Sequence, residues 1–299
     1  MLKDIYKKYK AANAPLKFVY INVAVYVFVV LIGAFSTLFN AGDTVDNVVR
    51  FFELPSSLPQ LVMRPWTLFT YMFIHKDFSH ILWNMLALFF FGRVFLNFYS
   101  VRHFVGMYLL GGLLGGVAFV LSYNLFPYFA PVVSVGSLVG ASASVLAIIV
   151  ASAVRSPEYR VNLFLFGSVK LSTLAFVMVA VSLLMLPMSN AGGNIAHVGG
   201  AFSGWLMAYM LGKGVDLTML INKPLDWVAT LFGKSKSRGK GKRTKFTYSP
   251  GGRSADYEYN ARKKDNEAEV DRILEKIKKG GYASLSDDEK KRLFDASSK

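Results

Sequence analysis

The chain has 299 residues, of which 53% are apolar and none is cysteine, and its formal net charge is +15. The absence of cysteine excludes disulfides, thiol catalysis and cysteine-bound metals. Most apolar residues fall in long blocks before residue 213, whereas most charged residues follow it. This division excludes an ordinary water-soluble domain and is typical of a membrane protein.

The first long apolar run, from Phe18 to Phe39, predicts a transmembrane helix. At about 22 residues it is too long for the apolar region of a signal peptide, and no small-residue cleavage site follows it. We therefore expect this helix to be retained, after a short cytoplasmic segment at residues 1–16.

The segment from Asn40 to Asp77 is polar and contains proline, yet it carries apolar clusters such as Leu68 to Phe73. Clusters of this kind favour short helices that lie in the bilayer interface. We expect the segment to be an ordered external loop.

Five more apolar runs predict five more spans. With the first, they make an all-α bundle of six transmembrane helices in a domain at residues 17–212. The further predicted helices are Ser79 to Phe98, Phe104 to Phe126, Ser142 to Val154, Leu171 to Leu186 and Ile195 to Leu211. Glycines are dense in the third span, which permits close packing of helices.

The basic residues indicate which side of the membrane each loop occupies. Six spans place both termini on one side, where the N-terminal segment, the loops after the second and fourth spans and the tail are all basic. The opposite side has only Arg50, Arg64 and Lys76. Because basic loops stay in the cytoplasm, we expect a multi-pass protein of the cell membrane with both termini cytoplasmic.

The tail after the last span divides into three parts. Residues 213–265 contain an apolar stretch from Pro224 to Phe232, expected to lie in the interface, and a linker with seven Lys or Arg residues from Lys234 to Lys245. No folded basic face is predicted there, so we expect the linker to bind anionic lipid and not nucleic acid. Residues 266–299 predict a small helical hairpin, with a capping box from Ser286 to Glu289.

Three polar residues inside predicted spans share one depth in the membrane. Counted from the basic residue that ends each helix, His80, Ser142 and His197 lie 13, 13 and 16 residues away. At about 1.5 Å per residue they lie roughly 20–24 Å from the cytoplasmic boundary of a hydrocarbon layer about 30 Å thick. A helix that begins at that depth, as the fourth does after Gly140, must be preceded by backbone buried in protein or lining a water-filled cavity. Hydrolysis would need such a cavity, open to the outside.

This set of residues supports acyl transfer by a serine nucleophile. Ser142 at a helix start has free backbone N–H groups beside it, which suit a developing oxyanion. His197 can act as the general base, and a small-residue face from Gly200 to Gly204 would bring its helix close to Ser142. Asn84, one turn from His80 on the same face, adds amide donors. No Asp or Glu lies in these spans, so we expect a dyad.

Other chemistries fit the sequence less well. Gly140-x-Ser142-x-Ser144 is similar to the nucleophile elbow of soluble hydrolases, but that elbow follows a strand and we expect none here. Ser144 should point away from the site, about 200° around the helix. A zinc protease needs a His-Glu-x-x-His helix, which the stretch after His75 is not, and a transporter usually has paired halves. We expect His75 and His103 to be structural.

Together these motifs resemble the rhomboid family of intramembrane serine proteases. The resemblance covers roughly residues 17–212, and its motifs are His80-Ile81-Leu82-Trp83-Asn84, Gly140-Ala141-Ser142 and Ala196-His197-Val198-Gly199-Gly200. It implies that Ser142 is the nucleophile and His197 the base, while His80, Asn84 and the backbone N–H of Ser142 stabilise the oxyanion. It also implies transmembrane protein substrates, cut in or beside a helix, and no metal or cofactor.

Two positions depart from the family's pattern. The glycine that usually follows the nucleophile is Ala143 here, and the aromatic residue one turn later that packs on the histidine is Leu146. The alternative function is that of a catalytically inactive relative that binds or delivers membrane clients.

Overall fold

The structure is a computed structural model that describes residues 9–163, 167–188 and 190–231, together with residues 272–273, 275–277, 284–286 and 288–290. The chain divides into two compact units, residues 1–237 and 238–299, and each is described by itself.

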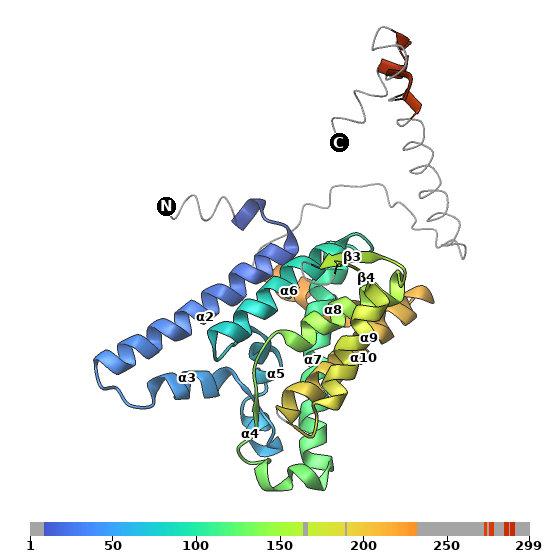
Figure 1. The fold of residues 1–299 in the computed structure, drawn as a ribbon. Helices are drawn as coiled ribbons and strands as arrows, with labels where there is room; N and C mark the ends of the chain where they lie inside the picture. The colour runs from blue at the N-terminus through green and yellow to red at the C-terminus, as the bar shows by residue number, and fades with distance from the viewer. Residues whose placement is uncertain are drawn as a thin grey trace. The chain divides into compact units, whose positions relative to one another are not determined.

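Six long helices form most of the first unit, and their ends fall within a few residues of the six predicted runs (Figure 1). They are α2 (Ala14–Leu38), α6 (Phe78–Leu96), α7 (Val101–Leu125), α8 (Ser142–Arg155), α9 (Leu171–Leu184) and α10 (Ala191–Gly212). Among the described residues, α2, α6 and α7 are long and apolar enough to cross a membrane, and α8 and α9 are apolar but shorter. The chain is therefore an integral membrane protein.

Polar residues at the helix starts explain where the long helices begin. The Asp77 carboxylate accepts a hydrogen bond of 2.7 Å from the backbone N–H three residues later, at the start of α6. Ser100 and His103 form a capping box at the start of α7. Asn190, whose φ is 48°, caps α10 in the same way as Asp77 caps α6. These side chains satisfy N–H groups that have no partner within the helix.

The predicted external loop is ordered and contains short helices. They are α3 (Thr44–Phe52), α4 (Leu58–Met63), α5 (Thr67–Thr70) and the 3-10 turn η1 (Tyr71–Phe73). The Trp66 ring N–H donates to the carbonyl of Phe51 at 2.8 Å, and the Thr70 hydroxyl donates to that of Phe52 at 2.7 Å. These contacts between separate short helices give the loop a defined shape.

The fold is mostly helical, but the expectation that no strand precedes the serine is wrong. After the 3-10 segment η2 (Pro127–Val132), β2 (Ser137–Leu138) pairs antiparallel with β1 (Leu54–Pro55), and β3 (Arg160–Leu163) pairs with β4 (Gly167–Lys170). Strands of two to four residues are too short to show an alternating apolar pattern. Among the described residues β2 pairs only with β1 of the external loop, so it differs from the sheet strand that leads into a hydrolase elbow.

Helices α7, α8 and α10 form the tightly packed centre of the first unit. A Cβ atom on Gly200 of α10 would collide with the main chain of Ala143 in α8. One on Gly204 would collide with the main chain of Ala147, and one on Gly115 of α7 would lie 2.6 Å from the Ala143 Cβ. The glycines therefore allow backbones to touch, as expected for helices packed inside a membrane.

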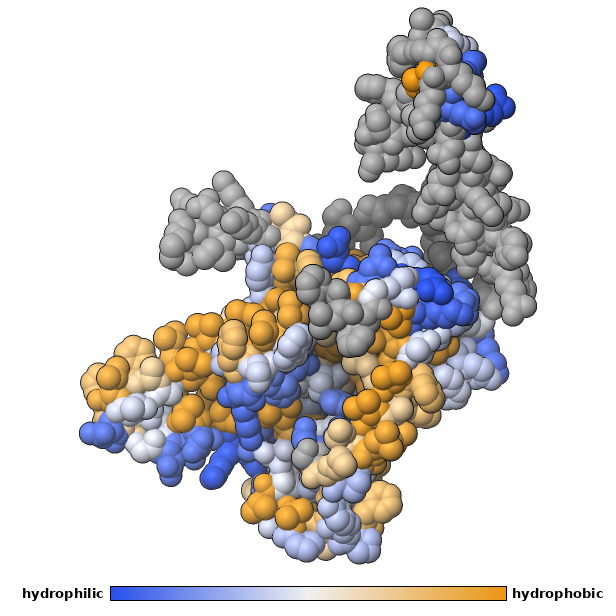
Figure 2. Space-filling model, in the orientation of Figure 1, coloured by the Kyte–Doolittle hydropathy of each residue, from blue (hydrophilic) through white to orange (hydrophobic). Residues whose placement is uncertain are grey.

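Helix α2 lies at the edge of this centre and is mostly uncovered. Figure 2 shows apolar surface along α2 and on the side where α9 lies. The buried Asn22 amide donates to the Tyr108 hydroxyl at 3.2 Å, and that hydroxyl donates to the carbonyl of Met72 at 3.0 Å. This chain of hydrogen bonds links α2, α7 and the external loop.

The helix that follows the bundle, α11 (Met219–Leu231), begins five residues before the predicted interfacial stretch at Pro224. The Asn222 amide donates to the carbonyl of Arg102 at 3.1 Å, and the Arg102 guanidinium pairs with Asp226 at 2.5 Å. Exposed Leu220 and Trp227 are two of its large apolar side chains. Its exposed apolar side chains suit an interfacial position.

The predicted capping box is confirmed in the second unit. The N–H of Ser286 donates to the Glu289 carboxylate at 2.7 Å, and the N–H of Glu289 donates to the Ser286 hydroxyl at 3.3 Å. Residues 1–8, the basic linker from Lys234 to Lys245 and most of the predicted hairpin lie outside the described residues.

Candidate functional site

The loop that leads into α8 is fixed by the external loop. The N–H of Gly140 donates to the carbonyl of Tyr71 at 2.9 Å, and the N–H of Ala141 donates to Nε2 of His75 at 3.4 Å. Gly140 has φ +116°, and a Cβ atom there would lie 2.7 Å from ring atoms of His80. Only glycine satisfies both the backbone conformation and the space at this position. Ser142 then begins α8 with its N–H free of helical partners.

Ser142 and His197 are in direct contact. The Ser142 Oγ lies 2.8 Å from Nε2 of His197, which stands in the second turn of α10. The close approach of α10 to α8 at Gly200 and Gly204 positions the ring. A hydroxyl and an imidazole at this distance can exchange a proton.

His80 and Asn84 lie on neighbouring turns of α6 and face the same cavity as Ser142. One N–H of the Asn84 amide donates to the carbonyl of His80 at 2.9 Å. An amide nitrogen carries two hydrogens, so one remains for another acceptor. The structure therefore brings all four predicted site residues together around one space.

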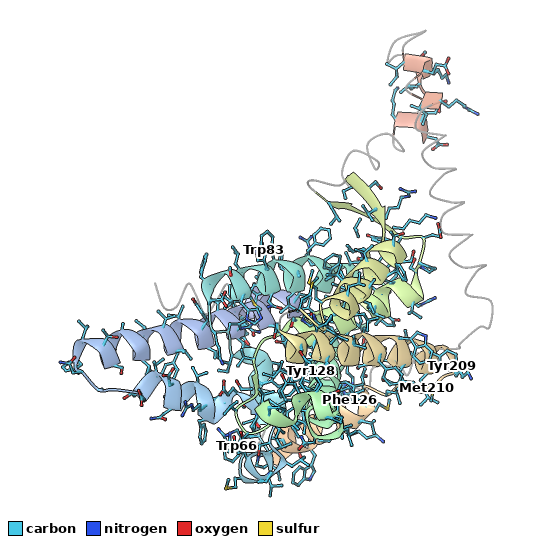
Figure 3. All side chains as sticks on the ribbon, turned by 60° about the horizontal axis from the view of Figure 1, so that its bottom comes forward. Trp66, Trp83, Phe126, Tyr128, Tyr209 and Met210 are labelled. Atoms are coloured by element: carbon cyan, nitrogen blue, oxygen red, sulfur yellow. The ribbon has the colours of Figure 1, made fainter. Side chains whose placement is uncertain are left out.

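That space is a cavity of about 700 Å³. It is bounded by α6, α8, α9, α10 and the segment from Ser137 to Val139. Lys76, Asp77 and Ser79, which are exposed on the surface, also line it, so the cavity reaches the surface. Trp83 of α6 is 69% exposed, and Figure 3 shows it projecting outward from the edge of the bundle.

A fifth residue, which contacts His197, was missed in the sequence. The hydroxyl of Ser182 on α9 lies 3.2 Å from Nδ1 of His197, on the opposite side of the ring from Ser142. The signal that could have found it is a polar residue in the middle of an otherwise apolar run. A serine in a helix so often bonds only its own backbone that the signal is weak by itself.

The remaining histidines and Ser144 lie outside this contact. Ser144 is buried, and its hydroxyl lies 3.9 Å from the sulfur of Met72, so it points away from the cavity as expected. His103 caps α7 and lies 3.3 Å from Asp216. His75 is buried beside His80, with ring centres 5.0 Å apart. Burial, helped by the nearby His80, lowers the pKa of His75 to about 4.

The charged residues at the cavity are at its surface end. Lys76 pairs with Glu53 at 3.0 Å, and hydrogen bonds from Ser79 and from the backbone of His80 lower the pKa of Asp77. No group of three or more His, Asp or Glu side chains that could hold a metal ion is found in the described part of the chain.

A comparison with models of protein families finds the Rhomboid domain over residues 63–214, half of the chain. The chain belongs to the rhomboid family. The matched range of this rhomboid contains His80, Asn84, Ser142 and His197 and ends just after α10. Residues 253–299 match a second family, DUF6576, which is described as a family of unknown function. No curated protein matches the chain.

Proposed function

We propose that this rhomboid is an intramembrane serine endopeptidase that cleaves peptide bonds in or beside the transmembrane helices of membrane proteins. The observation that carries the proposal is the 2.8 Å contact between Ser142 Oγ and His197 Nε2 at a cavity that reaches the surface. A buried dyad without access to water could not hydrolyse its acyl intermediate.

The reaction would begin when the Ser142 oxygen attacks the substrate carbonyl carbon and its proton moves to Nε2 of His197. The carbonyl electrons move to oxygen, and the imidazolium then gives its proton to the amide nitrogen as the C–N bond breaks. Water would attack the carbonyl carbon of the resulting ester and lose a proton to His197, which would pass that proton to the Ser142 oxygen as the bond between this oxygen and the carbonyl carbon breaks.

The developing oxyanion needs donors that already point at it. The N–H of Ser142, the second N–H of the Asn84 amide and a ring N–H of His80 are the groups that would supply them. The His80 ring takes up the space where a Cβ atom of Gly140 would lie, which supports this role because it places one of the donors beside the start of α8.

The proposed membrane arrangement has six spans, which adds α8, α9 and α10 to the three helices that are long and apolar enough. At 14 residues, α8 rises only about 21 Å and would start inside the bilayer, at the level of the cavity. Both termini would be cytoplasmic in the cell membrane, and the basic linker would contact anionic lipid.

The test is covalent labelling of the purified full chain with a serine-reactive phosphonate, read beside cleavage of a model transmembrane substrate. We expect the wild-type chain to be labelled and active, and Ser142→Ala and His197→Ala to lose both. Ser144→Ala is the matched control, because Ser144 lies on the same helix and points away from the cavity. A wild-type chain that takes no label, but binds membrane proteins, would instead support the inactive relative.

A further inference from the structure

Ser182 makes two contacts that restrict the position of one proton. Its hydroxyl donates to the carbonyl of Met178 at 3.0 Å and lies 3.2 Å from Nδ1 of His197. A hydroxyl has one hydrogen to give. If the Ser182 hydrogen points at the Met178 carbonyl, the Ser182 oxygen can only accept a hydrogen bond from the His197 ring. Nδ1 of His197 must then carry the hydrogen of that bond.

The consequence reaches the other side of the ring. A neutral imidazole has one N–H, so a hydrogen at Nδ1 leaves the lone pair of Nε2 facing the Ser142 hydroxyl. This is the tautomer that a general base needs. The Ser142 hydroxyl can rotate to donate or to accept, so it does not by itself select the tautomer.

We propose that Ser182 is a positioning residue that holds His197 in the Nδ1–H tautomer and accepts a hydrogen bond from the imidazolium during proton transfer. The inference rests on the proposed function. Within the described residues, the hydrogen bonds of the His197 ring are those to Ser142 and Ser182, so α9 supplies the group that a carboxylate supplies in a triad.

The other charged and titratable groups at the cavity do not take this role. Asp77 is engaged by Ser79 and by the backbone of His80 at the surface end, and Lys76 pairs with Glu53. His80 lies on α6, whereas Nδ1 of His197 faces α9. Ser182 is buried, and its hydroxyl occupies the position beside Nδ1 of His197 at 3.2 Å.

The first measurement is the nitrogen NMR spectrum of the full chain labelled with 15N-histidine, in detergent. The chain has 4 histidines, so single substitutions of the other three assign the His197 ring. We expect Nδ1–H with an unprotonated Nε2 in the wild type and a mixture of both tautomers in Ser182→Ala. An Nε2–H tautomer in the wild type, or an unchanged Nδ1–H tautomer in Ser182→Ala, would overturn the inference.

The second measurement is turnover of the model substrate. Losing the acceptor for the imidazolium should lower kcat of Ser182→Ala about ten-fold and leave KM within about two-fold, whereas Ser182→Thr should recover most of the loss. Ser152→Ala is the matched control, because Ser152 makes the same backbone contact at 2.8 Å, within α8. Equal kcat in Ser182→Ala and Ser152→Ala would also overturn the inference. The tautomer is read without turnover, so it tests Ser182 even if the wild-type chain proves inactive.

Discussion

Helix α10 carries His197 and helix α9 carries Ser182, which contacts the His197 ring, but the two helices are fixed in different ways. Helix α10 is fixed by its backbone, since Gly200 and Gly204 press against the main chain of α8. Helix α9 buries only Leu171, Ala175 and Ser182, and its Phe176 is 73% exposed. The separation between Ser142 and His197 is thus set by rigid packing, whereas the support from Ser182 depends on a lightly packed helix.

The largest effect is expected from breaking the α8–α10 contact with a single methyl group. Gly200→Ala places a Cβ atom against the main chain of Ala143, which cannot move aside as a side chain would. We expect stability to fall by about 1–3 kcal/mol and cleavage to fall by about 100-fold, because a shift of about 1 Å misaligns the dyad. Thermal unfolding in detergent and substrate cleavage measure the two quantities.

Gly212→Ala is the control for that experiment. It lies at the end of the same helix, and a Cβ atom there has nothing within 4 Å. If both alanine variants behave alike, the close packing of α10 does not determine the geometry of the site.

A second effect, on stability alone, compares phenylalanines on the two sides. Phe119 of α7 is fully buried against Gly192 of α10, so Phe119→Ala should cost about 3 kcal/mol from the cavity that it leaves. Phe176→Ala on α9 should change stability by less than about 0.5 kcal/mol, because that side chain is mostly uncovered. Similar losses in the two variants, measured by unfolding in detergent, would show that α9 is packed as tightly as the centre.

The smallest effect at neutral pH involves His75, which joins the external loop to the packed centre through Ala141. The pKa of His75 is about 4 in the folded chain and about 6.5 in an unfolded one. Between pH 4 and pH 6.5 the unfolded chain therefore binds a proton at His75 that the folded chain does not. Stability should therefore be unaffected above pH 6.5 and fall as the pH is lowered toward 4, by at most about 3 kcal/mol.

His75→Gln provides the comparison, since its amide oxygen can still accept from the N–H of Ala141 but does not titrate. The variant should show a weaker loss of stability between pH 6.5 and 4 than the wild type. Parallel curves for the two chains would assign the acid sensitivity to other groups.

The positions of the long helices could be predicted because each is a nearly continuous apolar run ended by polar or basic residues, such as Arg155 after α8. The two strand pairs could not be predicted in this way. Leu54 and Leu138 pair across 84 residues of sequence, and neither pair of residues has a local pattern that distinguishes it from a loop. Such pairing is decided by the packing of the whole bundle.

The site was predictable to the extent that its residues interrupt apolar runs. Ser142, His197, His80 and Asn84 all stand out in this way, and a shared depth was enough to suggest that they meet. Ser182 also interrupts a run, but no calculation of depth shows which way it turns about the axis of α9. The role of His75 at Ala141 depended on the folded path of the external loop, which has no periodic signal.

The pairing of the external loop with the segment before Ser142 has a consequence during synthesis. The backbone N–H of Ser56 donates at 3.0 Å to the carbonyl of Gly136, a residue that is made 80 residues later. At about 5–20 residues per second, a ribosome needs roughly 4–16 seconds to cover that interval. During that time Ser56 has been made and its partner has not, so the segment before Ser142 can be fixed only after the nascent chain has grown past Gly136.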